Sequence, residues 1–427
     1  MRRNLAFLFL WLLACNTSLA QTLTELERML FDLPDVRFER VESNANLDTY
    51  LLHVKQPVDH TAPEKGHFYQ QVFLLHRGFD APMVMNTDGY NLTRRPSELV
   101  GFLDSNYISV EHRFFGPSTP DGQPWENLTI QQAAADYHHI REILGEIYQS
   151  DWVSTGISKG GETCTYYKWF YPDDVSVSVP YVAPFPDELK DPRIYDFLAT
   201  KGSQELRDRI FAFQKAVLEN KAELVPLFEY YLKGRGSKVE YIGGPEAALE
   251  LFVLEYPFSF WQSGKSPDSV PDATDDPKKL LDHLLDGGDY WYLLDDQTEG
   301  MAAHYYQHAT QYGYYGYQTK PFGDLISKWP EEPSALFFPY ADKLPYDPDV
   351  RDNLMKWIQT EADNIIFIYG ADDTWTVCQA DLGDNTHLKK YILEGKHHGS
   401  ARISRCDDEQ KNEILAEIRS RLGDKRP

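Results

Sequence analysis

The segment from Trp152 to Gly161, WVSTGISKGG, constrains the fold of this chain more than any other. Its first residues have the β-branched and aromatic character of a strand, and a helical pattern follows it. Between the two, Gly156 and Gly160 flank Ser158 in a Gly-x-Ser-x-Gly sequence. A sharp strand-turn-helix elbow leaves no room for a β-carbon at the glycine positions, and it lifts the serine hydroxyl clear of a sheet. The segment predicts a nucleophilic Ser158, although a glycine-rich turn with an ordinary serine has the same pattern.

Apolar runs of strand length alternate with helical patterns on both sides of this elbow. Asp48 to Val58 alternates like an edge strand, and the last helix is predicted to start near Asp407. Further candidate strands cover residues 68–76, 82–89, 107–113, 175–182, 364–370 and 389–393, and a candidate helix covers 130–148. Strands that alternate with helices predict an α/β fold with a largely parallel, doubly wound sheet.

Residues 187 to 329 have a helical pattern that interrupts these strands. Leu206, Ile210, Phe213 and Val217 share one helix face, and Tyr and Trp gather toward the end of the region. Because the sheet resumes afterwards, we expect an inserted helical cap whose aromatic side closes over a pocket; a purely structural helical subdomain is the alternative. The predicted division is a first part of the core at 21–186, the cap at 187–335 and a second part of the core at 336–427.

The late strands are followed by an aspartate and a histidine. Asp373 lies three residues after Gly370, and His397 follows the strand that ends at Leu393. In an open α/β sheet, catalytic groups lie on the loops that leave the carboxyl ends of strands. The order Ser158, Asp373, His397 is that of the α/β-hydrolase fold. We therefore expect this fold and a triad in which the histidine takes the serine proton and the aspartate orients the histidine.

The oxyanion that forms during such a reaction needs hydrogen-bond donors placed in advance. We assign one to the backbone N–H of Lys159, the residue after the nucleophile. The other is assigned to the backbone N–H of Tyr90, in the loop of residues 88–91.

Two triad assignments have neighbouring rivals, Asp372 for Asp373 and His398 for His397. Spacing from the preceding strand favours Asp373. The double histidine could instead indicate zinc, but no carboxylate or cysteine lies at ligand spacing, so we expect no metal and no cofactor.

The chain is strongly acidic, with 42 Lys and Arg against 66 Asp and Glu and a net charge of -24. This balance argues against nucleic acid or an anionic membrane surface as a partner. It would attract a cationic ligand such as a peptide amino terminus, although it can equally serve solubility alone. The sequence does not indicate an oligomeric state.

Several short motifs together resemble the secreted bacterial prolyl tri/tetrapeptidyl aminopeptidases, over nearly the whole mature chain. The motifs are LHR at 75–77, FDAP at 79–82, DGYN at 88–91, EHRFFG at 111–116, LTIQQA at 128–133 and GISKGG at 156–161. The chain is more distantly similar to the prolylcarboxypeptidase and dipeptidyl-peptidase family. The Gly-x-x-Asp-Pro-Trp stretch of that family, which carries the catalytic Asp, maps onto 370–375 with Thr374 in place of Pro. Its Gly-Ala-His tail maps onto 395–397, which favours His397 over His398.

The resemblance implies a serine exopeptidase that cleaves after proline and releases a short peptide from a free amino terminus. A proline ring is compact and rigid, so an aromatic slot can bind it at little entropic cost. Candidates for the slot are Tyr90, Phe114, Phe115, Trp375, Tyr305 and Tyr306, of which Phe114 and Phe115 could equally belong to the core. A carboxylate in the cap would hold the substrate ammonium. Which carboxylate does so, and whether a di-, tri- or tetrapeptide is released, stay open.

The first twenty residues have the pattern of an export signal. Arg2 and Arg3 precede an apolar run too short to span a bilayer, and small residues end at Ala20. We expect a secreted or periplasmic protein; a lipoprotein anchored through Cys15 is the alternative. Three cysteines would remain, of which Cys378 and Cys406 are expected to form a disulfide and Cys164 to stay buried and free.

Two other functions remain compatible with the sequence. A triad and an oxyanion hole do not distinguish amide from ester substrates, so an esterase on the same fold is one alternative. A surface binding protein that has kept the hydrolase scaffold without its activity is the other.

Overall fold

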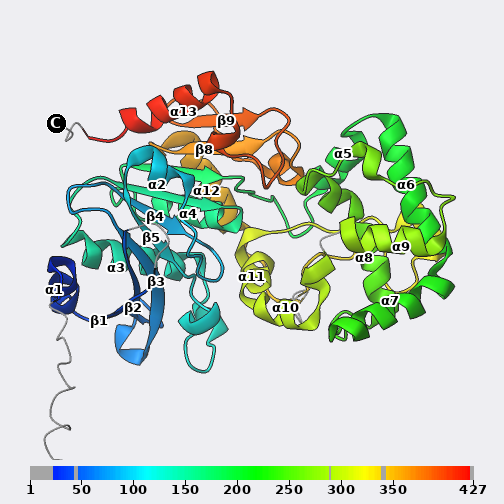
Figure 1. Cartoon of the computed structure of the whole chain (residues 1–427), viewed down its shortest axis with the longest axis horizontal. Helices are drawn as coiled ribbons and strands as arrows, with labels where there is room; N and C mark the ends of the chain where they lie inside the picture. The colour runs from blue at the N-terminus through cyan, green and yellow to red at the C-terminus, as the bar shows by residue number, and fades with distance from the viewer. Residues whose placement is uncertain (1–22, 43–46, 288–289, 338–342, 424–427) are drawn as a thin grey trace, which may run out of the picture.

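The computed structural model describes residues 23–42, 47–287, 290–337 and 343–423. Figure 1 shows a core built on one large sheet and, beside it, a lobe made of helices. The predicted signal segment at 1–20, with Cys15, lies outside the described residues. Among the residues described, no helix is both long and apolar enough to cross a membrane.

A nine-stranded sheet forms the core, in the order β1-β2-β3-β5-β4-β6-β7-β8-β9. The strands are β1 (Val36–Arg40), β2 (Asp48–Pro57), β3 (His67–His76), β4 (Met83–Thr87), β5 (Asn106–Val110), β6 (Trp152–Ile157), β7 (Val177–Tyr181), β8 (Ile366–Gly370) and β9 (Lys389–Leu393). The first strands pair antiparallel as far as β5, and every pair from β5 to β9 is parallel. The sheet is therefore mixed and mostly parallel, as an α/β-hydrolase core requires.

The central strands are buried on both faces, which explains their continuous apolar runs. Every residue of β4, β5, β7 and β8 is buried, as expected of strands covered by helices on both sides. The expected edge position of the strand at 48–58 is wrong. β2 pairs with β3 on one side and with the short β1 on the other, so β1 is the edge.

Helices cover both faces of the sheet, so the core is doubly wound. The core helices are α1 (Glu25–Asp32), α2 (Glu98–Leu103), α3 (Ile130–Gly145), α4 (Lys159–Phe170), α12 (Pro348–Thr360) and α13 (Asp408–Ser420). One apolar cluster joins α1, α3 and α4 to one face, and a second joins α2 and α13 to the other. Asp407 is the N-cap of α13, accepting from the backbone N–H of Gln410, which explains where this helix begins.

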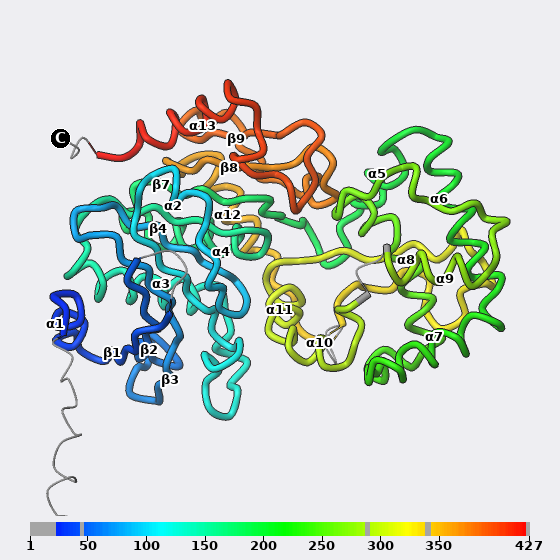
Figure 2. Tube along the Cα trace, in the orientation of Figure 1, coloured from blue at the N-terminus to red at the C-terminus, as the bar shows by residue number. Residues whose placement is uncertain are grey.

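The helical lobe is inserted between β7 and β8, as the tube in Figure 2 shows. Its α-helices are α5 (Pro192–Thr200), α6 (Gln204–Glu219), α7 (Lys221–Arg235), α8 (Pro245–Gln262), α9 (Pro277–Gly287), α10 (Asp295–Gly300) and α11 (Ala302–Gln307). The predicted face of Leu206, Ile210, Phe213 and Val217 lies in the core of the lobe. Helix α8 is buried along most of its length, which explains its apolar character on all sides. The exact boundaries of the cap stay a prediction.

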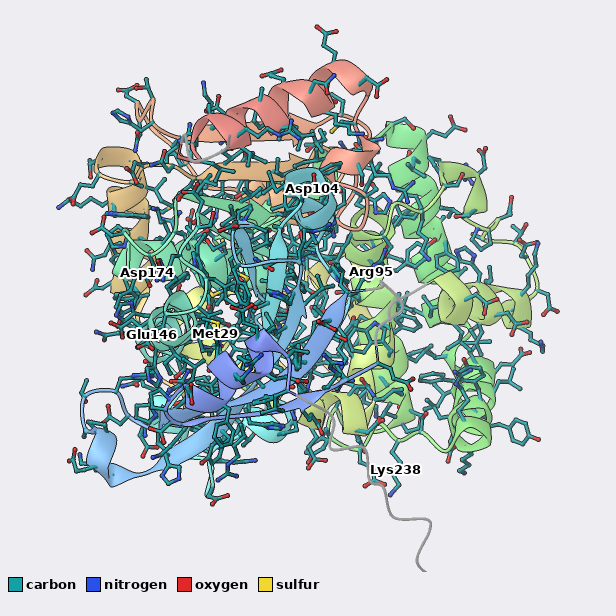
Figure 3. The ribbon with its side chains drawn as sticks, turned by 60° about the vertical axis from the view of Figure 1, so that its left-hand side comes forward. Met29, Arg95, Asp104, Glu146, Asp174 and Lys238 are labelled. Atoms are coloured by element: carbon teal, nitrogen blue, oxygen red, sulfur yellow. The ribbon has the colours of Figure 1, made fainter. Side chains whose placement is uncertain are left out.

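The orientation of the sheet decides which strand ends face the lobe. Glu146 precedes β6 and Asp174 precedes β7, and Figure 3 shows both labelled residues on the side of the core away from the lobe. The amino ends of these parallel strands therefore point away from the lobe. Their carboxyl ends, and the loops that leave them, face it.

Candidate active site

Ser158 lies in a strained turn between β6 and α4. Its backbone has φ 58 and ψ -126, a conformation that costs a non-glycine residue about 1–3 kcal/mol. A β-carbon at Gly160 would lie 2.7 Å from the carbonyl oxygen of Asp88, and one at Gly161 would lie 2.9 Å from that of Tyr181. These contacts explain why the second and third residues after Ser158 are both glycine. The elbow that the sequence predicts is confirmed.

The structure pairs Asp373 with His398, and the expected pairing with His397 is wrong. Nδ1 of His398 lies 2.7 Å from Oδ2 of Asp373, whose side chain is fully buried. Nδ1 of His397 lies 3.3 Å from the backbone oxygen of Gln262 instead. The His397 ring also lies directly against Gly264, where a β-carbon would come within 2.6 Å of its Cγ. Ser158 and His398 line one cavity, and His397 is not among its lining residues.

Asp373 is set apart from its neighbour Asp372 by the loop after β8. Asp372 points to the surface, where its Oδ1 lies 2.6 Å from Nζ of Lys201. Asp373 is instead the N-cap of the short helix η9 (Thr374–Cys378), accepting the backbone N–H of Trp375 at 3.2 Å. One oxygen of Asp373 is thus fixed by its own loop, and the other faces His398. The preference for Asp373 agrees with this geometry.

The phenol of Tyr90 lies where the oxyanion donors were expected. Burial raises its pKa, the nearby charge of Glu162 adds to the rise, and hydrogen bonds with the Ser158 hydroxyl and the backbone N–H of Lys159 oppose it. The Tyr90 hydroxyl therefore lies within hydrogen-bonding reach of the Ser158 side chain and of the backbone N–H of Lys159. It can supply the second donor through its side chain; the backbone N–H assigned from the sequence stays a prediction.

The loop that carries Tyr90 is locked against the elbow. Gly89 has φ +74, and a β-carbon there would lie 2.8 Å from the backbone nitrogen of Gly160. Nζ of Lys159 donates to the carbonyl oxygen of Gly89 at 2.6 Å, and burial lowers the pKa of this lysine to about 7. On the other side of the loop, Asp88 accepts from Ser109 and from the backbone N–H of Thr93, and burial raises its pKa to about 7.

A cavity of about 520 Å³ lies between the core and the helical lobe, and residues of both line it. Ser158 and His398 line it from the core. Three of the predicted slot residues, Tyr90, Trp375 and Tyr305, line it as well. The lobe and Ser158 therefore line the same cavity, as expected if Ser158 is the nucleophile.

The other three predicted slot residues lie outside the cavity wall. Phe114, Phe115 and Tyr306 belong with Trp125 to a small apolar cluster beside it. The Phe115 ring packs edge-on against Tyr90, with 6.0 Å between ring centroids, and Phe114 and Tyr306 pack on Trp125. Their placement as substrate contacts is corrected: Phe115 supports Tyr90 from behind, and the other two fill the cluster.

Several polar residues of the cavity could not be predicted from the sequence. Glu255 comes from α8, Glu162 from α4, and His304 and His308 from the end of the lobe. No motif singles out any of them. Because they lie far apart in the chain, only the tertiary fold brings them to one wall.

The Glu-His-Arg part of the EHRFFG motif has a structural explanation. Arg113 is fully buried, and its Nε and Nη2 donate to the two oxygens of Asp136 at 2.7 and 2.8 Å. Glu111 accepts the backbone N–H of Leu92 and the hydroxyl of Ser118. A bidentate buried pair of this kind fixes geometry, so the motif stabilises the floor under the Tyr90 loop.

The expected disulfide is absent: Cys378, Cys406 and Cys164 are all free thiols. Sγ of Cys378 is buried and lies 3.6 Å from Oδ2 of Asp191, at the base of the lobe. Sγ of Cys406 lies against the backbone oxygen of Arg402, within the apolar cluster under α13. In the described part of the chain, no three His, Cys, Asp or Glu side chains form a group that could hold a metal ion.

Comparison with known proteins places this geometry in a family. PS-10 peptidase S37 matches residues 23–423. The chain is 31% identical over 407 residues to the prolyl tri/tetrapeptidyl aminopeptidase of Streptomyces mobaraensis, covering 92% of this chain and 84% of that protein.

Solved structures of low identity are also similar to the chain. The proline iminopeptidase of Mycobacterium smegmatis matches with a TM-score of 0.41 at 13% identity, covering 90% of this chain and 98% of that one. A thermostable carboxyl esterase of Bacillus coagulans matches with a TM-score of 0.35 at 14% identity, with the same coverage. The topology described above and the family match together give the conclusion: the chain is a serine-type peptidase of the α/β-hydrolase fold and belongs to the PS-10 peptidase S37 family.

Proposed function

We propose that this chain is an exported exopeptidase that cleaves after proline and releases tri- or tetrapeptides from free amino termini. The observation that carries the proposal is the convergence of Ser158, His398 and the Tyr90 hydroxyl in one cavity with aromatic walls. The name of the Streptomyces mobaraensis relative supports the proline and peptide-length preferences. The basic and apolar pattern of residues 1–20 supports export.

The proposed reaction begins with proton transfer from Ser158 to His398. Because Nδ1 of His398 is held against Asp373, that nitrogen carries the proton and Nε2 is left to accept the serine proton. The serine oxygen then attacks the carbonyl carbon that follows the proline ring. Asp373 stabilises the imidazolium that forms.

The negative charge on the substrate oxygen is then stabilised by donors at the start of α4. The donors in this proposal are the backbone N–H of Lys159 and the Tyr90 hydroxyl, which lies within hydrogen-bonding reach of Ser158. His398 gives its proton to the leaving amine, which breaks the C–N bond and leaves an acyl-enzyme on Ser158. Water, activated by the same histidine, releases the peptide and restores the serine.

The aromatic walls account for a preference for proline. Trp375 follows Asp373 by two residues, and its ring packs edge-on against Phe258 and Tyr315, each 5.2 Å away between ring centroids. Rigid rings held in this way offer a proline a flat apolar surface beside the triad.

Steady-state hydrolysis of Ala-Ala-Pro-p-nitroanilide, Gly-Pro-p-nitroanilide and p-nitrophenyl acetate tests the proposal. We expect the tripeptide amide to have the highest kcat/KM and Ser158→Ala to abolish its hydrolysis. Hydrolysis of the ester alone would indicate an esterase. Failure of a fluorophosphonate to label Ser158 would indicate a binding protein without activity.

A further inference from the structure

Two of the described residues that line the cavity are acidic, Glu162 and Glu255. We propose that Glu255, on helix α8 of the cap, binds the α-ammonium group of the substrate and thereby determines the requirement for a free amino terminus. This inference rests on the proposed peptidase function. It names the residue that would make the enzyme an exopeptidase.

Neutral hydroxyl groups hold the Glu255 carboxylate in place. Tyr315 and Tyr317 donate to Oε2 at 3.0 and 2.9 Å, and Ser259 donates to Oε1 at 2.8 Å. Glu255 is only 2% exposed. Hydroxyl donors of this kind fix the orientation of the carboxylate at the cavity wall.

Aromatic rings surround this anion. Burial, and then the negative charge of Glu255, raise the pKa of four phenols: Tyr292, Tyr305, Tyr315 and Tyr317. The first three of these also line the cavity. Ring faces attract ammonium groups, most strongly where water is excluded. A carboxylate among aromatic rings is therefore suited to a primary ammonium.

The position of Glu255 along α8 fits the length of the released peptide. Glu255, Ser259 and Gln262 recur at helical spacing and all line the cavity. Oε1 of Gln262 accepts the indole N–H of Trp375 at 3.1 Å, so this end of the helix lies beside the triad loop. Seven residues of α-helix span about 10 Å, which equals the reach of about three extended residues.

Glu162 is less suited to the same role. It follows Ser158 by four residues, about 6 Å along the helix, which is too close for the far end of a tripeptide. Both its oxygens are buried without a hydrogen-bond partner among the described residues, and its Oε2 lies 4.0 Å from Nε2 of His308. Burial raises its pKa well above the usual range, although Lys159 acts in the opposite direction. A carboxyl group that favours its neutral form is a weak partner for an ammonium ion.

Two substrates that differ only in the amine test the proposal. Ala-Ala-Pro-p-nitroanilide carries the ammonium, and propanoyl-Ala-Pro-p-nitroanilide has hydrogen in its place. The full chain, with Glu255→Gln, Glu255→Asp and the matched control Glu162→Gln, is assayed with both. The rate of fluorophosphonate labelling of Ser158 reports whether the triad of each variant is intact.

We expect the wild type to prefer the free amine by about 100-fold in kcat/KM, a factor typical of removing one partner of a buried charge pair. Glu255→Gln should reduce this ratio to below about 5, with kcat/KM on the propanoyl substrate within about 3-fold of wild type. Glu255→Asp should restore part of the ratio. Glu162→Gln should leave the ratio within about 3-fold, whatever its absolute rates.

Other results would overturn the inference. One is an unchanged ratio of kcat/KM between the two substrates in Glu255→Gln. Another is an equal loss of kcat/KM on both substrates in that variant. The third is a loss of the ratio in Glu162→Gln and not in Glu255→Gln. Failure of the proposed function has a different signature, because the wild type would then cleave neither amide.

Discussion

The geometry assigns His398 as the catalytic base, whereas the sequence predicted His397. Substituting each histidine in turn distinguishes the two assignments. His398 lies 2.7 Å from Asp373, whereas His397 contacts the backbone of Gln262. We expect His398→Ala to lower kcat by about 10⁴- to 10⁶-fold, the loss seen when the base of a triad is removed. This corresponds to about 5–8 kcal/mol of activation free energy.

His397→Ala removes one hydrogen bond of 3.3 Å and the contact with Gly264. A bond of this kind contributes about 1 kcal/mol to stability, so kcat should stay within about 3-fold of wild type while the melting temperature falls by a few degrees. Hydrolysis of Ala-Ala-Pro-p-nitroanilide measures kcat, and circular dichroism confirms that both variants fold. A loss above 10³-fold in His397→Ala, with His398→Ala within tenfold of wild type, would refute the assignment.

Two further predictions concern the loop and the elbow that meet at Ser158. Tyr90→Phe should lower kcat by about 10²-fold with little change in KM, because one oxyanion donor is lost while the ring stays; an unchanged kcat would show that the phenol is not a donor. Lys159 has a pKa of about 7 in the folded chain, which is lower than the pKa of the same lysine in the unfolded chain. Above pH 7 the unfolded chain therefore binds more protons than the folded chain. The free energy of unfolding should consequently rise with pH. In urea denaturation, the free energy of unfolding of the wild type should rise between pH 7 and 9 by about 1–3 kcal/mol more than that of Lys159→Met. Equal changes of this free energy with pH in the two proteins would contradict the low pKa.

The sequence predicted the parts of the site that depend on local geometry. The elbow follows in part from a local steric limit, because a β-carbon at Gly156 would clash with the backbone of Gly160, whereas the limits at Gly160 and Gly161 come from Asp88 and Tyr181 on neighbouring segments. The strand that leads into it, β6, and the late strand β8 follow from apolar runs covered on both faces, whereas β9 is a partly exposed edge strand. Asp373 could be predicted from its distance to the end of β8.

The choice between His397 and His398 depends on a turn whose backbone the sequence does not determine. Both residues follow β9 by only a few positions, and a change of one residue sends the side chain in a different direction. The structure directs His397 toward Gln262 in the cap and His398 toward Asp373. Resemblance to a distant family was a poor guide here, because alignment of a short tail leaves an uncertainty of one residue.

The predictions of a disulfide and of three of the six aromatic slot residues were wrong for a related reason. Cys378 and Cys406 both lie after late strands, but one packs at the base of the lobe and the other in the cluster under α13. Phe114 and Phe115 lie near the site in space, yet they turn into a separate cluster. Proximity to a site can be predicted from sequence more readily than the direction of a side chain.

Trp375 connects helix α8 of the cap to the loop that carries Asp373 in the core. Its backbone N–H fixes Oδ1 of Asp373, while its indole N–H is held by Gln262 of α8. Its ring packs against Phe258 and Tyr315, and Tyr315 also orients Glu255. We therefore expect a shift of α8 to displace Asp373, which contacts His398. Because the same contacts join the cap to the loop of Asp373, we expect substitutions in α8 that displace Trp375 to change kcat as well as KM.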